Sequence, residues 1–149
     1  MRIFILLLVF IGFFKLNGQE KISYEDKVVA KMAVHPNCKF IPADQKREQT
    51  VCLQKNLWAE LNTKLSHYMN FVLPEHVKFI KAKVAFVITK DGKIEQIEVT
   101  ESSNRGFAAH LSRSMKKLAN EIDYIEPAEL IDGTKVSFKF VLPVNIMNE

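Results

Sequence analysis

The stretch that most limits how this chain can fold is Lys83–Glu101, which reads KVAFVITKDGKIEQIEVTE. Two apolar segments flank Asp91-Gly92. An Asp-Gly pair between two such segments is a strong sign of a β-hairpin with a type I′ turn, because that turn needs a positive φ at both central residues. Val84, Phe86 and Ile88 alternate toward one face, as side chains do in a strand. The sequence therefore predicts two antiparallel strands joined by a tight turn.

The second strand of this hairpin does not keep a single alternation. Ile94 lies on the opposite parity to Ile97 and Val99. One extra residue in a strand switches the face of every side chain that follows, so a β-bulge near Glu95-Gln96 would place all three on one face.

A helix is predicted before the hairpin. Asp44 is a suitable N-cap, and Pro74 sets the latest possible end. Between them apolar residues recur at helical spacing. This stripe consists of Leu53, Leu57, Leu61, Leu65 and Met69, widened by Val51, Trp58 and Tyr68.

A second helix and a last strand follow the hairpin. Ser102, Ser103 or Asn104 can cap the helix, and Asp132-Gly133 predicts a turn after it. The apolar face of the helix consists of Phe107, Leu111, Met115, Leu118 and Ile122. The last strand is predicted over Lys135–Leu142, where apolar and polar residues alternate, and Pro143 is expected to stop regular pairing there.

The element order helix–strand–strand–helix–strand predicts the fold class. We expect an α+β domain with a three-stranded antiparallel sheet, the first hairpin strand at its centre and both helices on one face, where they bury their apolar stripes. The near-continuous apolar run of the first strand favours the central place.

The first 34 residues are expected to lie outside this domain. Arg2 precedes an uncharged apolar run of about 12 residues, Ile3–Phe14, which is shorter than the roughly 20 residues of a spanning helix. Residues 1–18 are therefore interpreted as a cleaved export signal, with an uncleaved membrane anchor as the alternative. Residues 19–34 are predicted to form a flexible arm, and residues 35–149 the domain.

The chain has two cysteines, Cys38 and Cys52. In an exported protein, two cysteines at this separation predict one disulfide. A reactive or metal-binding pair is the alternative, but the sequence has neither CxxC spacing nor a neighbouring group of metal ligands.

The remaining composition argues against several classes of function. The formal net charge is +4, and the basic residues form no stripe interleaved with aromatics, so a nucleic-acid partner is not expected. The four histidines are scattered, at His35, His67, His76 and His110. Ser102 and Ser103 resemble helix caps more than nucleophiles. We expect no enzyme activity, no catalytic, cofactor or metal site, and no small-molecule substrate.

The order of these motifs resembles the TonB C-terminal domain family over roughly residues 35–146. The matching residues are Val84–Ile88 before Asp91-Gly92, Ile97 and Val99 before Ser102-Ser103, and then Pro127-Ala128, Gly133, Val136 and Leu142-Pro143. The chain departs from the family where Ala82 replaces the usual glycine and Ala108 an aspartate. The predicted arm of residues 19–34 is also shorter than the long spacer of an energy transducer. Fully extended, its 16 residues span at most about 55 Å.

The resemblance implies a periplasmic domain that binds protein by strand addition. Its partner would be an extended segment of a TonB-dependent outer-membrane transporter. The expected binding edge is the last strand, made up of Lys135, Val136, Ser137, Phe138, Lys139, Phe140, Val141 and Leu142.

Three alternatives stay open. Lys135 and Lys139 can protect this edge against any pairing. The domain can be a structural or adaptor module of the cell envelope that contacts peptidoglycan or forms a homodimer through the same edge. An uncleaved N-terminus would make it a membrane-anchored energy transducer.

Overall fold

The computed structural model describes residues 29–147, which form two α-helices and two three-stranded antiparallel sheets. The elements in chain order are β1 (Val29–Lys31), η1 (Pro36–Cys38), α1 (Lys46–Phe71), β2 (Phe79–Ile88), β3 (Ile94–Ser102), α2 (Arg105–Glu121), β4 (Ala128–Leu130), β5 (Lys135–Val136) and β6 (Phe138–Met147). The predicted α+β class is confirmed, and the expected signal over residues 1–18 lies outside the described residues.

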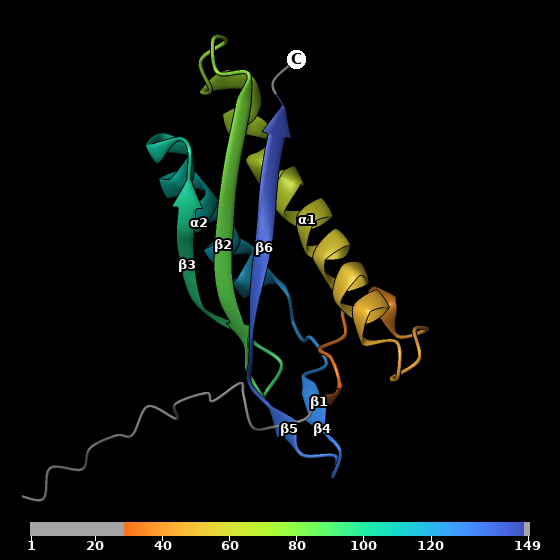
Figure 1. Ribbon diagram of the computed structural model, residues 1–149. Coiled ribbons are helices and arrows are strands. Elements are labelled where there is room, and N and C mark those ends of the chain that lie inside the picture. Colours follow the sequence, from red (N-terminus) through yellow and green to blue (C-terminus); the bar gives the residue numbers. More distant parts are fainter. Residues whose placement is uncertain (1–28, 148–149) are drawn as a thin grey trace, which may run out of the picture.

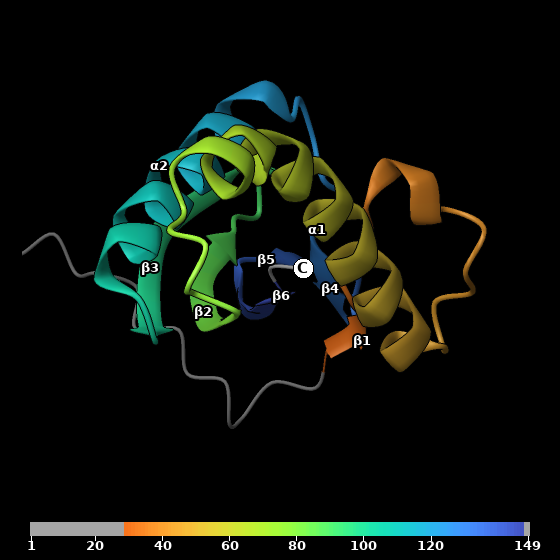
Figure 2. The ribbon, with the colours of Figure 1, turned by 90° about the horizontal axis from the view of Figure 1, so that it is seen from above.

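The larger sheet has the order β3-β2-β6, so the first hairpin strand lies at its centre as predicted. Both helices cover the same face of this sheet (Figures 1 and 2), with α2 over β3 and α1 toward β6. No helix within residues 29–147 covers the other face. A two-layer arrangement buries one face of the sheet and one stripe of each helix, which is the elementary way to build a core from these elements.

The core lies between the sheet and the helices. The predicted stripe of α1 is completely buried at Leu53, Leu57, Leu61 and Leu65. The helix begins later than predicted, after Gln45 and not after Asp44. The reason is a turn in which the backbone N–H of Gln45 donates to the carbonyl of Pro42, 3.1 Å away, so that Asp44 stays before the helix.

The second helix follows its sequence signals closely. Asn104, one of the three candidate caps, accepts a hydrogen bond from the backbone N–H of Phe107 at 2.8 Å. Phe107, Leu111 and Met115 are fully buried. An N-cap bond of this kind satisfies one of the N–H groups that a helix leaves unpaired at its start.

The hairpin turn differs from the prediction. Only Gly92 has a positive φ, +78°, and Asp91 does not, so the turn is not type I′. The N–H of Gly92 donates to the carbonyl of Thr89, and the N–H of Thr89 donates to the carbonyl of Lys93. The loop therefore has three residues, with Gly92 as the left-handed residue that closes it.

The predicted bulge in β3 is confirmed. Val87 pairs with Glu95 and Ala85 pairs with Glu98, so the second strand contains one extra residue between these positions. Gln96 lies in this extra stretch with a φ of +51°, a conformation that relatively few residues other than glycine adopt. The bulge brings Ile94, Ile97 and Val99 to the helix-covered side, where all three contact the core.

A second, smaller sheet with the order β1-β4-β5 was not predicted. It shows that the flexible arm assigned to residues 19–34 is wrong for its last six residues. Val29–Lys31 form β1, Ala33 is fully buried, and Val34 exchanges two backbone hydrogen bonds with Glu126. These contacts come from a segment more than 90 residues away, which local sequence patterns do not report.

The predicted last strand, Lys135–Leu142, is in fact two strands in two sheets. Lys135 and Val136 form β5 and pair with β4, whereas β6 starts at Phe138 and pairs with β2. Ser137 lies at the change of sheet, and its Oγ accepts a hydrogen bond from the backbone N–H of Lys90 at 3.0 Å. This bond fixes the transition to the loop of the β2–β3 hairpin.

The contact between the two helices contains a titratable group. The His110 ring stacks on Tyr68, with the ring centroids 4.4 Å apart. Desolvation by burial, together with the nearby charges of Arg113 and His67, lowers the pKa of His110 below its ordinary 6.5. The folded protein therefore holds a neutral His110 more readily than the unfolded chain does.

This pKa shift predicts a loss of stability in acid. As the pH falls through 6.5, the unfolded chain binds a proton at residue 110 before the folded protein does, so the free energy of unfolding decreases. A His110→Gln variant should lose less stability than the wild type between pH 7.5 and pH 5.5, as measured by urea unfolding. Equal losses in both proteins would contradict this assignment.

Candidate functional site

The best candidate for a binding surface is the outer edge of β6. In the order β3-β2-β6 this strand pairs with β2 on one side, and no other strand within residues 29–147 pairs with its second side. Figure 1 shows β6 as the outermost strand of the larger sheet. A strand edge of this kind presents backbone N–H and C=O groups that can pair with another strand.

The register of the sheet shows which residues of β6 direct their backbone groups to the free side. The carbonyls of Lys81 and Lys83 accept hydrogen bonds from Ser103 and Thr100, so these odd-numbered residues of β2 face β3. The even-numbered residues of β2 therefore face β6, and their partners are the even-numbered residues of β6. The free side thus belongs to Lys139, Val141, Pro143, Asn145 and Met147.

This parity explains why the expected break at Pro143 is wrong. Pro143 lies within β6, which continues to Met147 and stays paired with β2 throughout. Proline lacks an N–H, but at an odd-numbered position the missing donor belongs to the free side and not to the ladder with β2. The edge consequently offers four N–H groups, from Lys139, Val141, Asn145 and Met147.

The side chains of β6 alternate between the two faces of the sheet. Phe140, Leu142 and Val144 point into the core, whereas the odd-numbered side chains lie on the helix-free face of the sheet and are exposed. Among them Val141 is 44% exposed and Met147 77%. An added strand would therefore lie beside an open, partly apolar surface that carries cations from both strands, Lys139 of β6 and Lys81 and Lys83 of β2.

Helix α1 runs beside this edge on the helix-covered face of the sheet. The amide Nε2 of Gln54 donates to the backbone carbonyl of Val141 at 3.2 Å. Val51 and Trp58, three residues before and four after Gln54, lie on the same side of the helix. Figures 1 and 2 both show α1 running beside β6 and not over β3. Sequence patterns gave no sign of this contact, which joins residues 87 positions apart.

The opposite edge of the sheet, formed by β3, is a weaker candidate. It carries Glu95, Glu98 and Glu101, and it is interrupted by the bulge at Gln96. Charges, bulges and irregular backbone are the features by which proteins keep an edge from pairing. These features make the β3 edge less suited to strand addition than the β6 edge.

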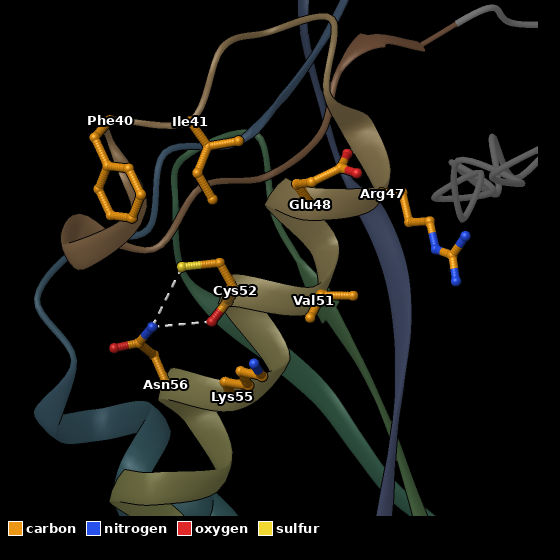
Figure 3. A pocket seen from close by; sticks show the side chains of 8 residues that line it. All are labelled: Phe40, Ile41, Arg47, Glu48, Val51, Cys52, Lys55 and Asn56. Atoms are coloured by element: carbon orange, nitrogen blue, oxygen red, sulfur yellow. Dashed lines mark hydrogen bonds between the residues drawn. The ribbon is translucent and has the colours of Figure 1, made fainter.

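A shallow pocket lies near the disulfide, on the outer side of α1. The Sγ atoms of Cys38 and Cys52 are 2.06 Å apart, at disulfide bond distance, and Asn56 donates to the carbonyl of Cys52. In Figure 3, the side chains of Phe40 and Ile41 lie above those of Cys52 and Asn56, while Arg47 and Val51 point away from them. Phe40 is 79% exposed. The pocket is lined by Phe40, Ile41, Arg47, Glu48, Val51, Cys52, Lys55 and Asn56.

The described histidines and acids form no arrangement suited to metal binding. Within residues 29–147 there is no group of three or more histidine, cysteine, aspartate or glutamate side chains that could hold a metal ion. Both ring nitrogens of the buried His35 already have partners, because its Nε2 lies 3.1 Å from Glu60 and its Nδ1 accepts the N–H of Asn37.

None of the helices described, α1 and α2 included, is long and apolar enough to cross a membrane.

Comparisons with known proteins give one similarity. No family model and no curated protein matches this chain. Among solved structures it is similar to the NMR solution structure of the TonB C-terminal domain of Helicobacter pylori. The sequences are 16% identical, the match covers 63% of this chain and 84% of the other, and the TM-score is 0.38. A likeness at this identity and TM-score carries no information about function.

Proposed function

We propose that this protein is an exported, periplasmic, non-enzymatic domain that binds an extended protein segment by strand addition along β6. The observation that carries the proposal is the free edge itself, with four outward N–H groups on Lys139, Val141, Asn145 and Met147 and a helix beside it. Backbone pairing supplies affinity in this mode, and alternate side chains supply specificity.

The partner would be an extended segment of a TonB-dependent outer-membrane transporter. This part of the proposal is supported by the motif order between Val84 and Pro143, which resembles the TonB C-terminal domain. On the helix side, Val51 and Trp58 favour apolar side chains in the partner at alternate positions. On the open side, Lys139 favours a carboxylate.

The binding residues differ from those expected from the sequence alone. Lys135 and Val136 belong to β5 in the smaller sheet, and Ser137 is engaged by Lys90, so these three are not part of the proposed edge. The proposed set is Phe138–Met147, with the odd-numbered residues in contact with the partner backbone. Proline at Ser137 would therefore be a poor test, because it would disturb the change of sheet.

A proline at Lys139 tests the proposal directly. Lys139→Pro removes an outward donor, places a ring against the incoming strand and leaves the ladder with β2 intact. We expect an affinity loss of about tenfold or more for synthetic peptides of extended periplasmic segments of such transporters, measured by calorimetry. Lys139→Ala is the matched control, because it removes the charge and keeps the donor.

Two results would count against the proposal. One is equal affinity of Lys139→Pro and Lys139→Ala, and the other is binding that moves to the β3 edge. Pro143→Ala gives the converse test, because it adds a fifth outward N–H and should raise the affinity severalfold. Sedimentation of the free domain tests the alternative use of this edge, in which a second copy pairs with β6.

A further inference from the structure

The hydrogen bond between Gln54 and Val141 occupies a group that an added strand needs. The carbonyl of Val141 lies on the free side of β6, and it already accepts the Nε2 of Gln54 at 3.2 Å. Two residues later, Pro143 provides no donor. The middle of the edge therefore lacks one free acceptor and one donor, while the positions on either side of it keep theirs.

We propose that Gln54 guards the β6 edge, its side-chain amide occupying the Val141 carbonyl until a partner strand displaces it. This proposal rests on the proposed function, because it identifies the residue that sets how readily the edge accepts a strand. A primary amide has the same donor chemistry as a backbone N–H, so it can take the place of one residue of a neighbouring strand.

The surrounding structure favours movement of the side chain alone and not of the helix. Leu53 and Leu57, on either side of Gln54 in sequence, are completely buried and hold this part of α1 against the core. Gln54 itself is only partly buried, and its contact with Val141 is exposed to solvent. Rotation of its side chain would release the carbonyl without loss of core packing. Covering an edge with part of a helix is also a known way to prevent unwanted pairing.

Gln54→Ala provides the test, with Asn62→Ala as the matched control, since Asn62 is an exposed amide residue two turns further along α1. Two quantities are measured in each protein: the carbonyl ¹³C chemical shift of Val141, and the affinity for the synthetic transporter peptides. We expect Gln54→Ala to shift the Val141 carbonyl and to raise the affinity two- to tenfold. Asn62→Ala should change neither. Gln54→Glu, which sets a carboxylate against the carbonyl, should also raise the affinity.

The outcomes separate this inference from the proposed function. If the wild type binds peptide and Gln54→Ala binds equally or more weakly, the guard role is wrong while strand addition stands. If only Gln54→Ala binds, the guard role is supported and the wild type does not act as proposed. If neither binds, both proposals are wrong. An unchanged Val141 shift in Gln54→Ala would overturn the guard role by itself.

Discussion

Replacing Gly92 with alanine is expected to lower the free energy of unfolding by at least about 3 kcal/mol. Gly92 has a φ of +78°, and a Cβ there would lie 2.4 Å from two ring carbons of Tyr124 and 2.5 Å from the carbonyl oxygen of Ile125. The Tyr124 ring is partly exposed and can move. The backbone of Ile125 cannot, because its N–H donates to the carbonyl of Gly92 at 3.0 Å.

Gly133→Ala is the matched control for this substitution. Gly133 has nearly the same φ, +81°, but a Cβ there would meet no atom within 4 Å. The Gly133→Ala variant should lose only the free energy that the backbone conformation costs, about 1–2 kcal/mol. Urea unfolding of both variants measures the difference. Equal losses would mean that the contact of the hairpin loop with Tyr124 and Ile125 contributes nothing to stability.

Removing the disulfide in a Cys38→Ala/Cys52→Ala variant is expected to cost about 3 kcal/mol, since the bond closes a loop of about 15 residues. It ties η1, at the start of the domain, to the second turn of α1. The unfolded chain without this bond has more conformations to lose on folding. The effect should also be local, with faster amide exchange around Phe40 and Ile41 than in β2.

Urea unfolding of the oxidised wild type and the double variant checks the size of this effect. Reduction of the wild type by a thiol should reproduce the result without any change of sequence. A loss below about 1 kcal/mol in both experiments would contradict the account, because it would mean that the loop between η1 and α1 is held equally well by its packing.

Local patterns predicted the parts of the fold that depend on local physics. The stripe from Leu53 to Leu65, the cap at Asn104 and the bulge at Gln96 all follow from periodicity or from a single side chain's hydrogen bonding. The turn type was wrong, although the turn was in the right place. An Asp-Gly pair is compatible with two loop lengths, and the contact of Gly92 with Ile125, 33 residues away, accompanies the longer one.

The site was predicted less completely, because it depends on pairing over long distances. The choice of β6 as the edge strand follows from the element order, but its limits do not. The split at Ser137 depends on β4 and on Lys90, and the continuation through Pro143 depends on which side of the strand its missing N–H faces. Gln54 gives no signal in the sequence, since a glutamine outside the apolar stripe of a predicted helix is ordinary.

The most direct test of strand addition is residue-resolved amide hydrogen exchange of the domain with and without bound peptide. The even-numbered amides of β6 pair with β2 and should exchange slowly in both states. The odd-numbered amides of Lys139, Val141 and Asn145 should exchange fast in the free protein and at least tenfold more slowly in the complex. Protection of β3 instead, or equal protection of odd and even amides, would contradict strand addition at β6.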